Sequence, residues 1–291
     1  QKGTVVLMTE SKKNNRWAKV VAGIAACLVL LLGGGFGLRA YNINYSVDST
    51  VSLDVNPSIQ ITANEKERVL EVIPLNDDAS VVIGDMDFSG RDLDVVINAL
   101  IGSMLKNGYL SEMANSILIS VDNNDPVKSA QLQERLAQEV SSLLQTDTFS
   151  GSVLSQTITD DASLSAMAET YGITVGKAQL IQEILNTSTG HTFEELAPLS
   201  INELNLILST GTTAATTAEK IISTVGSASD KAYIGEAAAK EIALADAGVA
   251  ESDLTKYEWD IDTERGVMVY EIEFSSGGYE YDYDINAVTG E

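Results

Sequence analysis

The sequence has little of what most metal-binding and catalytic proteins depend on. Its 291 residues include one cysteine and one histidine, which excludes a disulfide framework, a cysteine-rich metal site and a multi-histidine centre within one chain. Aromatic residues make up only 6%, which is sparse for a surface that stacks sugars or bases. Basic residues are also scarce, because 18 Lys and Arg oppose 42 Asp and Glu, a net charge of −24. We therefore expect no nucleic-acid partner, and no nucleotide, cofactor or zinc motif is present.

The charge is unevenly spread along the chain. Residues 1–39 hold six basic residues and one acidic residue, a net charge of +5, which leaves −29 for residues 40–291. Between these regions, residues 20–38 form a stretch of 19 residues without a charge. At about 1.5 Å per residue, a helix of this length crosses the hydrocarbon core of a bilayer. We predict a transmembrane helix over residues 17–39, preceded by a cytoplasmic piece at residues 1–16.

A cleaved signal peptide is the alternative for this apolar segment. Signal peptides have a shorter apolar core and small residues at the cleavage site, whereas Arg39-Ala40-Tyr41-Asn42 follows here. Basic residues gather before the segment and only Arg39 follows closely, so the positive-inside rule favours a cytoplasmic N-terminus. We expect a single-pass protein of the cell membrane with residues 40–291 outside. Because the chain begins with Gln1 rather than Met, we also expect a missing cytoplasmic piece.

The exported part has the patterns of an α+β protein with two modules. Residues 40–145 are predicted to form an α/β domain from a hairpin, a helix, a strand and a second helix. Its strands are expected at 47–62, 68–75, 80–83 and 116–121, and its helices at about 93–105 and 126–143. A polar loop at 146–165 opens a helical extension that reaches residue 208, with helices near 162–171, 175–187 and 201–208.

The last part of the chain is predicted to be a separate unit. Residues 209–230 are rich in Thr, Ala and Ser and are interpreted as a linker or a weakly ordered helix. Residues 231–291 then give a helix at 236–247 and three strands at 256–262, 267–274 and 279–285, with glycines in the turns. This order predicts a small α-β-β-β module.

The dipeptide Asn56-Pro57 is chemically unusual because it falls within the strand pattern of residues 47–62. The alternation continues through Pro57, which argues against a turn. One interpretation is an edge-strand proline, which cannot donate to a neighbouring strand. The other is a bond that cleaves itself, because the Asn side-chain nitrogen can attack its own carbonyl, and deamidation through the next nitrogen is blocked by proline. By parity Asp54 and Ser58 share the face of Asn56, so they are candidates to assist.

Other residues are weaker candidates for a catalytic or metal-binding role. His191 follows Thr189-Gly190 and is expected in an exposed turn before a short helix, without a pattern of nearby acid and nucleophile. Residues 282–286 imitate the start of a calcium loop, but Ala287 stands where that loop needs glycine. We expect no metal and no cofactor.

Two segments resemble known families. The run YSVDSTVSLDVNPSIQITANEKERVLEVIPLNDDA, with DLDVVINALIGSMLKNGYL and NSILISV after it, resembles the juxtamembrane region of the RsgI-type anti-sigma factors of Firmicutes. YGITVGKAQLIQEIL and LAPLSINELN look like the tail of the same region. The final segment, from AAAKEIALADAGV to DINAVTGE, resembles a PepSY domain.

The resemblance implies a transmembrane regulator. In such proteins a cytoplasmic segment holds an alternative sigma factor, the outer part senses an external ligand or envelope state, and an intramembrane site-2-type protease completes the release. Family members cut themselves at an Asn-Pro bond, which Asn56 and Pro57 match, and the halves stay associated. Residues 1–16 are too short to fold as a sigma-binding domain, so this role rests on the resemblance. Apart from such a single-turnover cut, no enzyme is expected.

A second hypothesis uses the PepSY resemblance alone. PepSY modules are linked to inhibition of proteases, so the chain could be a membrane-tethered protein that binds or inhibits an exported protease. In that case Asn56-Pro57 has only a structural role.

Overall fold

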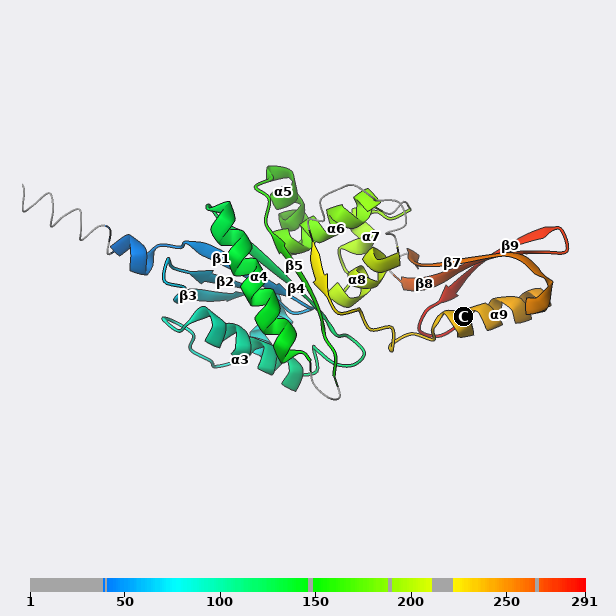
Figure 1. The fold of residues 1–291 in the computed structure, drawn as a ribbon, viewed down its shortest axis with the longest axis horizontal. Helices are drawn as coiled ribbons and strands as arrows, with labels where there is room; N and C mark the ends of the chain where they lie inside the picture. The colour runs from blue at the N-terminus through cyan, green and yellow to red at the C-terminus, as the bar shows by residue number, and fades with distance from the viewer. Residues whose placement is uncertain (1–38, 40, 146–148, 188–189, 211–221, 265–266) are drawn as a thin grey trace, which may run out of the picture. The chain divides into compact units, whose positions relative to one another are not determined.

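A computed structural model describes residues 39, 41–145, 149–187, 190–210, 222–264 and 267–291 (Figure 1). Contacts divide the chain into residues 1–46 and residues 47–291, and the second unit contains both sheets. None of the helices in the described part has the length and apolar character needed to cross a bilayer. The predicted span at residues 20–38 lies outside the described residues.

A mixed six-stranded sheet places β1 in its interior. Its order is β3-β2-β1-β4-β5-β6, and only β4 and β5 run parallel. Six residue pairs join β1 to β2 and six join it to β4. β1 is therefore hydrogen-bonded along both edges. The strands are β1 (Ser49–Asp54), β2 (Ser58–Ala63), β3 (Val69–Pro74), β4 (Ser116–Asn123), β5 (Ser152–Thr157) and β6 (Ser223–Val225).

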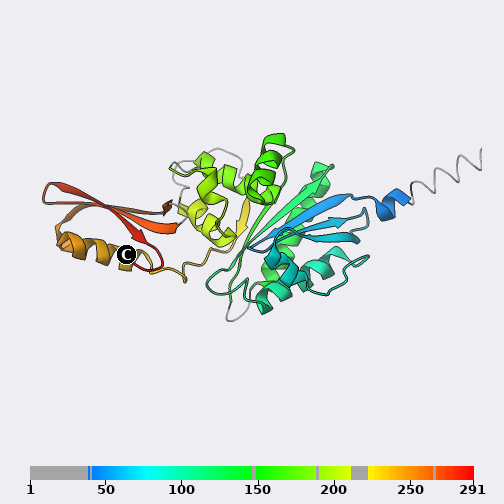
Figure 2. The same ribbon diagram turned by 180° about the vertical axis from the view of Figure 1, so that it is seen from behind.

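Helices cover both faces of this sheet. Val51 and Leu53 of β1 belong to the apolar core with α2 (Asp77–Ile83), α3 (Leu93–Lys106) and α4 (Pro126–Leu143). α4 crosses in front of the strands in Figure 1 and behind them in Figure 2. Leu118 and Leu154 point the other way, into a second core with the remaining helices of this region. These are α5 (Ala162–Tyr171), α6 (Val175–Thr187), α7 (Phe193–Leu196) and α8 (Ile201–Thr210).

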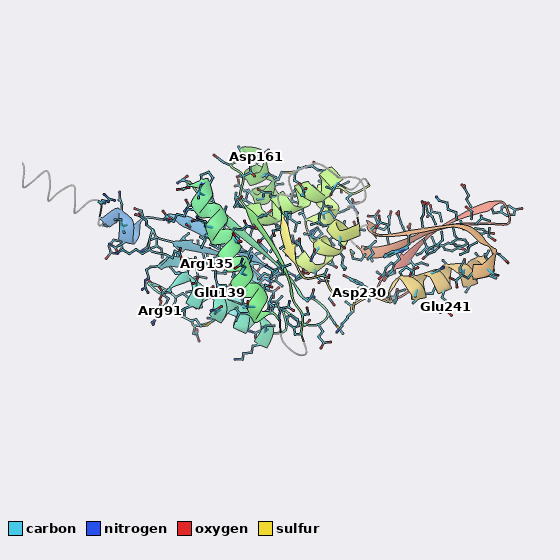
Figure 3. The ribbon with its side chains drawn as sticks, viewed as in Figure 1. Arg91, Arg135, Glu139, Asp161, Asp230 and Glu241 are labelled. Atoms are coloured by element: carbon cyan, nitrogen blue, oxygen red, sulfur yellow. The ribbon has the colours of Figure 1, made fainter. Side chains whose placement is uncertain are left out.

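Polar contacts tie α4 to α3. Arg135 and Glu139 lie one turn apart on α4, where Figure 3 labels both. The Arg135 guanidinium donates to Asp94 at the start of α3, and Asn98 donates to Glu139 over 2.8 Å. The first core is thus closed at its surface by contacts between its two long helices.

The C-terminal module confirms the predicted α-β-β-β order. α9 (Glu236–Ala247) precedes an antiparallel meander of β7 (Leu254–Glu264), β8 (Val267–Ser276) and β9 (Tyr279–Asn286). A short 3-10 turn, Glu251–Asp253, connects the helix to β7. Tyr270, Ile272 and Phe274 of β8 are buried within the second core, and Ala239 and Ala243 present the small side chains of α9 to it.

The single strand predicted over residues 47–62 is wrong, because the chain turns back at residues 55–57. Asp54 pairs directly with Ser58, Leu53 with Ile59 and Val51 with Ile61. Because the loop has three residues, each odd-numbered residue pairs with an odd-numbered one and each even-numbered residue with an even-numbered one. Paired residues lie on the same face of the sheet. The apolar–polar alternation therefore passes through the turn unchanged and hides it in the sequence.

Three other expectations need correction. Residues 80–83 lie in helix α2 rather than a strand, because the Asn76 side chain caps the helix by accepting from the Ala79 amide. Residues 152–157 form buried strand β5 rather than part of a loop. Its polar side chains find partners there, since Gln133 donates to Ser155 and Gln156 donates to Ser120. Within residues 209–230, residues 223–225 form strand β6 beside β5, while residues 211–221 lie outside the described part.

Gly176 sets how closely α6 approaches the sheet. A Cβ atom at this position would come within 2.0 Å of Ser120 Oγ and 2.6 Å of Ser120 Cβ. These contacts are too short for the backbone and β4 to keep their places, so only glycine allows α6 to lie this close.

We predict that Gly176→Ala lowers the free energy of unfolding by about 1–3 kcal/mol, because overpacking outweighs the gain in helix propensity. Gly102→Ala in α3 is the matched control, since nothing lies within 4 Å of its added Cβ. Urea unfolding of both variants measures the difference. A Gly176→Ala chain as stable as Gly102→Ala would show that α6 does not need the close approach.

Candidate functional site

The loop that joins β1 to β2 holds Asn56 in a strained conformation. Asn56 has a φ of 134°, a region that only glycine enters freely. The Val55 amide donates to the Pro57 carbonyl over 2.9 Å, which closes the loop around Asn56. Asn56 is exposed and Pro57 is buried, so the peptide bond between them passes from the surface into the protein.

Asp54, two residues before Asn56, is a buried carboxyl with one free oxygen. The residue is 1% exposed and lies on the sheet face that α6 covers. Thr174 Oγ1 donates to Asp54 Oδ2 over 2.7 Å, whereas Oδ1 has no hydrogen-bond partner among the described residues. Burial raises the pKa of Asp54, and hydrogen bonds from Ser58 and Thr174 and the charge of Lys177 lower it in part. This carboxyl is suited to carry a proton nearer neutral pH than an exposed aspartate does.

A cavity of about 150 Å³ connects Asp54 with the loop. The start of α8 closes one side of it, because the amide of its first residue, Ile201, donates to the Val55 carbonyl over 3.2 Å. Lys177 Nζ donates to the Leu199 carbonyl over 2.5 Å, and burial lowers the pKa of this lysine. The cavity is lined by Asp54, Val55, Asn56, Ser58, Asn76, Gly172, Ile173, Lys177, Ala197, Pro198 and Ile201.

The four residues singled out in the sequence are brought together, but for a different reason from the one expected. Asp54 and Ser58 face each other across the hairpin, rather than lying at i±2 on one strand. Ser58 is also held by the residue that follows β3, because its carbonyl accepts from the Leu75 amide over 3.0 Å. Asp54 and Ser58 thus line the same cavity as Asn56.

Sequence reasoning missed Thr174, Lys177 and Asn76. Thr174 precedes α6 and caps it by accepting from the Lys177 amide over 2.9 Å. Lys177 lies among apolar neighbours on α6. A cation within an apolar helical face is a signal in the sequence that could have marked it as a candidate site residue. Nothing in the sequence indicated that Thr174 meets Asp54, which lies 120 positions away.

His191 is not exposed as expected. Its side chain is 5% exposed, and its Nδ1 lies 2.8 Å from Asp262 Oδ1 on β7. The nearby Asp262 carboxylate raises the pKa of His191, with smaller contributions from the charges of Asp260 and Glu195, and these outweigh the lowering by burial. Within the described ranges, no group of three or more His, Cys, Asp or Glu side chains is placed to hold a metal ion.

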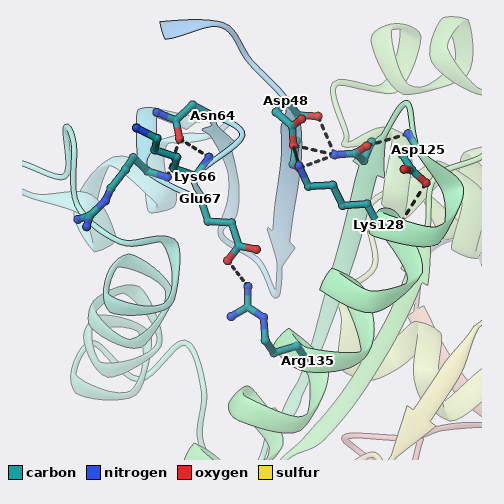
Figure 4. A network of polar contacts seen from close by, with 10 residues as sticks. Asp48, Asn64, Lys66, Glu67, Asp125, Lys128 and Arg135 are labelled. Carbon is teal, nitrogen blue, oxygen red and sulfur yellow. Dashed lines mark hydrogen bonds and ion pairs between the residues drawn. The ribbon is translucent and has the colours of Figure 1, made fainter. Parts of the chain in front are cut away.

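A polar network holds the start of β1 to the part of the chain that follows the loop (Figure 4). Lys128 Nζ on α4 lies 2.6 Å from Asp48 Oδ2, and Asn123 Nδ2 donates to both the carbonyl and the carboxylate of Asp48. The pKa of Asp48 is lowered, because these bonds and the Lys128 charge outweigh its partial burial. On the same side, Glu67 after β2 accepts from Arg135 of α4. Asp48 is therefore fixed to α4 and β4 by side chains as well as by the sheet.

Comparison with known proteins finds a family match for each module. Residues 48–183 match the family described as "Anti-sigma factor RsgI-like central domain", and residues 233–291 match "Peptidase propeptide and YPEB domain". The first match continues beyond the predicted domain boundary at residue 145 and includes α5 and most of α6.

Curated relatives carry names from the same family. Anti-sigma-I factor RsgI7 of Acetivibrio thermocellus is 27% identical over 187 residues, which cover 63% of this chain and 33% of the relative. Anti-sigma-I factor RsgI9 of the same organism is 28% identical over 193 residues, 63% of this chain and 27% of the relative. Anti-sigma-I factor RsgI of Bacillus subtilis is 29% identical over 75 residues, 25% of this chain and 20% of the relative. The chain thus spans between about a quarter and a third of the length of the first two.

We predict that backbone strain at residue 56 is measurable apart from any reaction. Asn56→Gly and Asn56→Ala both remove the side-chain amide, but only glycine adopts a φ of 134° without cost. The glycine variant is expected to be more stable than the alanine variant by about 1–3 kcal/mol in urea unfolding. Equal stabilities would show that the loop in solution does not hold this conformation.

Proposed function

The chain carries the central domain of the RsgI-type anti-sigma factors followed by a PepSY domain, and we propose that it is a membrane-anchored anti-sigma regulator that cuts itself at Asn56-Pro57. The observation that supports this most is the placement of a strained, exposed Asn56 over a buried carboxyl with an unpaired oxygen. Strain raises the energy of the intact loop, and the carboxyl supplies an acid where water has little access.

The cut would proceed by cyclisation of Asn56. Its Nδ2 attacks its own carbonyl carbon and loses one proton to water, which is available because Asn56 is exposed. The bond from that carbon to the Pro57 nitrogen breaks, and this nitrogen gains a proton from Asp54. Asp54 then takes a proton back from solvent, so protons balance. The products are a C-terminal succinimide at residue 56 and a chain that begins at Pro57.

The fold explains why such a cut would not separate the halves. The cut leaves β1 on the upstream half, where it stays paired with both β2 and β4 of the downstream half. Its buried Val51 and Leu53 and the ties of Asp48 to Asn123 and Lys128 add to this association. The halves are expected to part only when force or denaturation removes β1 from the sheet.

Signalling would use this separation. In the proposed scheme, residues before β1 lead through the predicted span at residues 20–38 to a cytoplasmic segment that holds an alternative sigma factor. The PepSY domain, residues 233–291, lies on the downstream half and would receive the external ligand or envelope state. Loss of the downstream half would expose the remaining stub to a site-2-type intramembrane protease.

We predict that the purified full chain gives two fragments on denaturing electrophoresis and one species on native gel filtration. Asn56→Ala is expected to give one intact chain, since it has no amide to cyclise. Asn98→Ala, in which a different exposed Asn is removed, is the control and should cleave as wild type. A wild-type chain that stays whole after long incubation would instead favour the membrane-tethered PepSY alternative.

We further predict that cleavage depends on protonated Asp54. The rate is expected to be highest at pH values below the raised pKa of Asp54 and to fall as pH rises through it, because the acid form is then lost. Asp54→Asn keeps the shape but supplies no acid, so the rate should fall by about 10²–10⁴-fold and this dependence should vanish. A pulse of cell-free synthesis in detergent, followed at several pH values, measures the rates. Unchanged cleavage in Asp54→Asn would remove the carboxyl from the mechanism.

A further inference from the structure

We propose that Thr174, in the segment before α6, is a positioning residue for the cleavage: it fixes the Asp54 carboxyl so that the free oxygen, Oδ1, carries the proton toward the Asn56-Pro57 bond. This inference rests on the proposed self-cleavage. It assigns a role to a residue 117 positions after Pro57 that reaches the site through its hydrogen bond to Asp54.

The direction of the hydrogen bond at Thr174 carries the argument. Thr174 Oγ1 accepts from the Lys177 amide over 2.9 Å, so its own proton is free to point elsewhere. Among the described residues, it donates to Asp54 Oδ2 at 2.7 Å. Oδ2 is therefore an acceptor in this pair, and the acid proton of Asp54 belongs on Oδ1.

Burial gives this assignment a consequence. Asp54 is 1% exposed, and within the described residues its Oδ1 has no hydrogen-bond partner. Asp54 and Asn56 line the same cavity. Without Thr174, the bond from Ser58 alone would orient the carboxyl, and the proton would be less firmly confined to Oδ1. The acid would then be aimed at the breaking bond for only part of the time.

The same bond makes cleavage conditional on the second layer of helices. Thr174 is held by α6, whose close approach to β4 requires Gly176. The loop is also held by the start of α8, through the Ile201 amide. Before these helices dock on the sheet, the hairpin would already contain the Asn-Pro bond, but Asp54 would not be held in place. Cleavage would therefore follow docking of the helices.

Charged groups around the carboxyl stay the same in the test variants. Lys177 on α6 faces Asp54, and Glu203 on α8 acts on Lys177. Asp54 also receives a hydrogen bond from Ser58 of β2. A shift in the pH dependence after a change at Thr174 alone therefore reports on the Thr174–Asp54 bond.

The test compares Thr174→Val and Thr174→Ser in the full chain. Thr174→Val keeps the side-chain shape without the hydroxyl, and cleavage is expected to slow by about tenfold, the order of one hydrogen bond. The pH at which the rate is half-maximal should rise, because a bond that stabilises the carboxylate is lost. Thr174→Ser keeps the donor and should restore both the rate and the pH profile.

Two controls separate this role from a structural one. Thr192→Val removes a threonine cap from α7 without touching Asp54, and should leave the rate and pH profile unchanged. The stability of Thr174→Val is measured in a chain that also carries Asn56→Ala, and is compared with that of Asn56→Ala alone. Both chains are then uncut. If wild type cleaves and a folded Thr174→Val cleaves equally fast with the same pH profile, the positioning role is wrong while self-cleavage stands. If wild type itself does not cleave, the proposed function fails.

Discussion

The burial of Asp54 beneath α6 is the interaction on which the site depends. A carboxyl at the end of an exposed hairpin would ionise and be hydrated, and the Asn-Pro loop beside it would have no acid. Here β1 lies inside the sheet, so its last residue is covered by the helices of the second layer. Gly176 lets α6 approach, Thr174 contacts the carboxyl, and the Ile201 amide fixes the loop. Three segments far apart in the sequence thus create one chemical environment.

The interior position of β1 links the chemistry to signalling. An edge strand with a cut at its end would fray, because only one neighbour holds it. β1 has a neighbour on each side, a buried apolar face and the Asp48 contacts at its start. The proposed cut would therefore change the covalent connection of the chain without changing its fold. The two halves would stay associated in the folded protein and separate only when β1 is removed from the sheet.

Much of this fold could be predicted from local patterns. The 3.6-residue periodicity of α3, the capping residues of α4 and the glycine-separated strands of the C-terminal module gave elements that the structure confirms. The hairpin at residues 55–57 could not be found in this way, since an odd loop preserves the alternation. β5 was missed because its Ser and Gln side chains look like those of a loop until their buried partners are known.

The site divides in the same way. Asn56 and Pro57 were recognisable because their chemistry lies in adjacent residues, and Asp54 and Ser58 because they lie close in sequence. Thr174 and Lys177 depend on how α6 docks on β4, which no local pattern specifies. The buried environment of His191 was hidden for a similar reason, because its partner Asp262 is on β7.

Intact mass spectrometry of the folded wild-type chain tests the central claim most directly. The account predicts two masses from one native species, a fragment that begins at Pro57 and an upstream fragment that ends in Asn56. Freshly formed, the upstream fragment should be lighter by one water molecule than its hydrolysed form, as a succinimide requires. A single mass for the uncut chain, or a break at any other bond, would contradict the account.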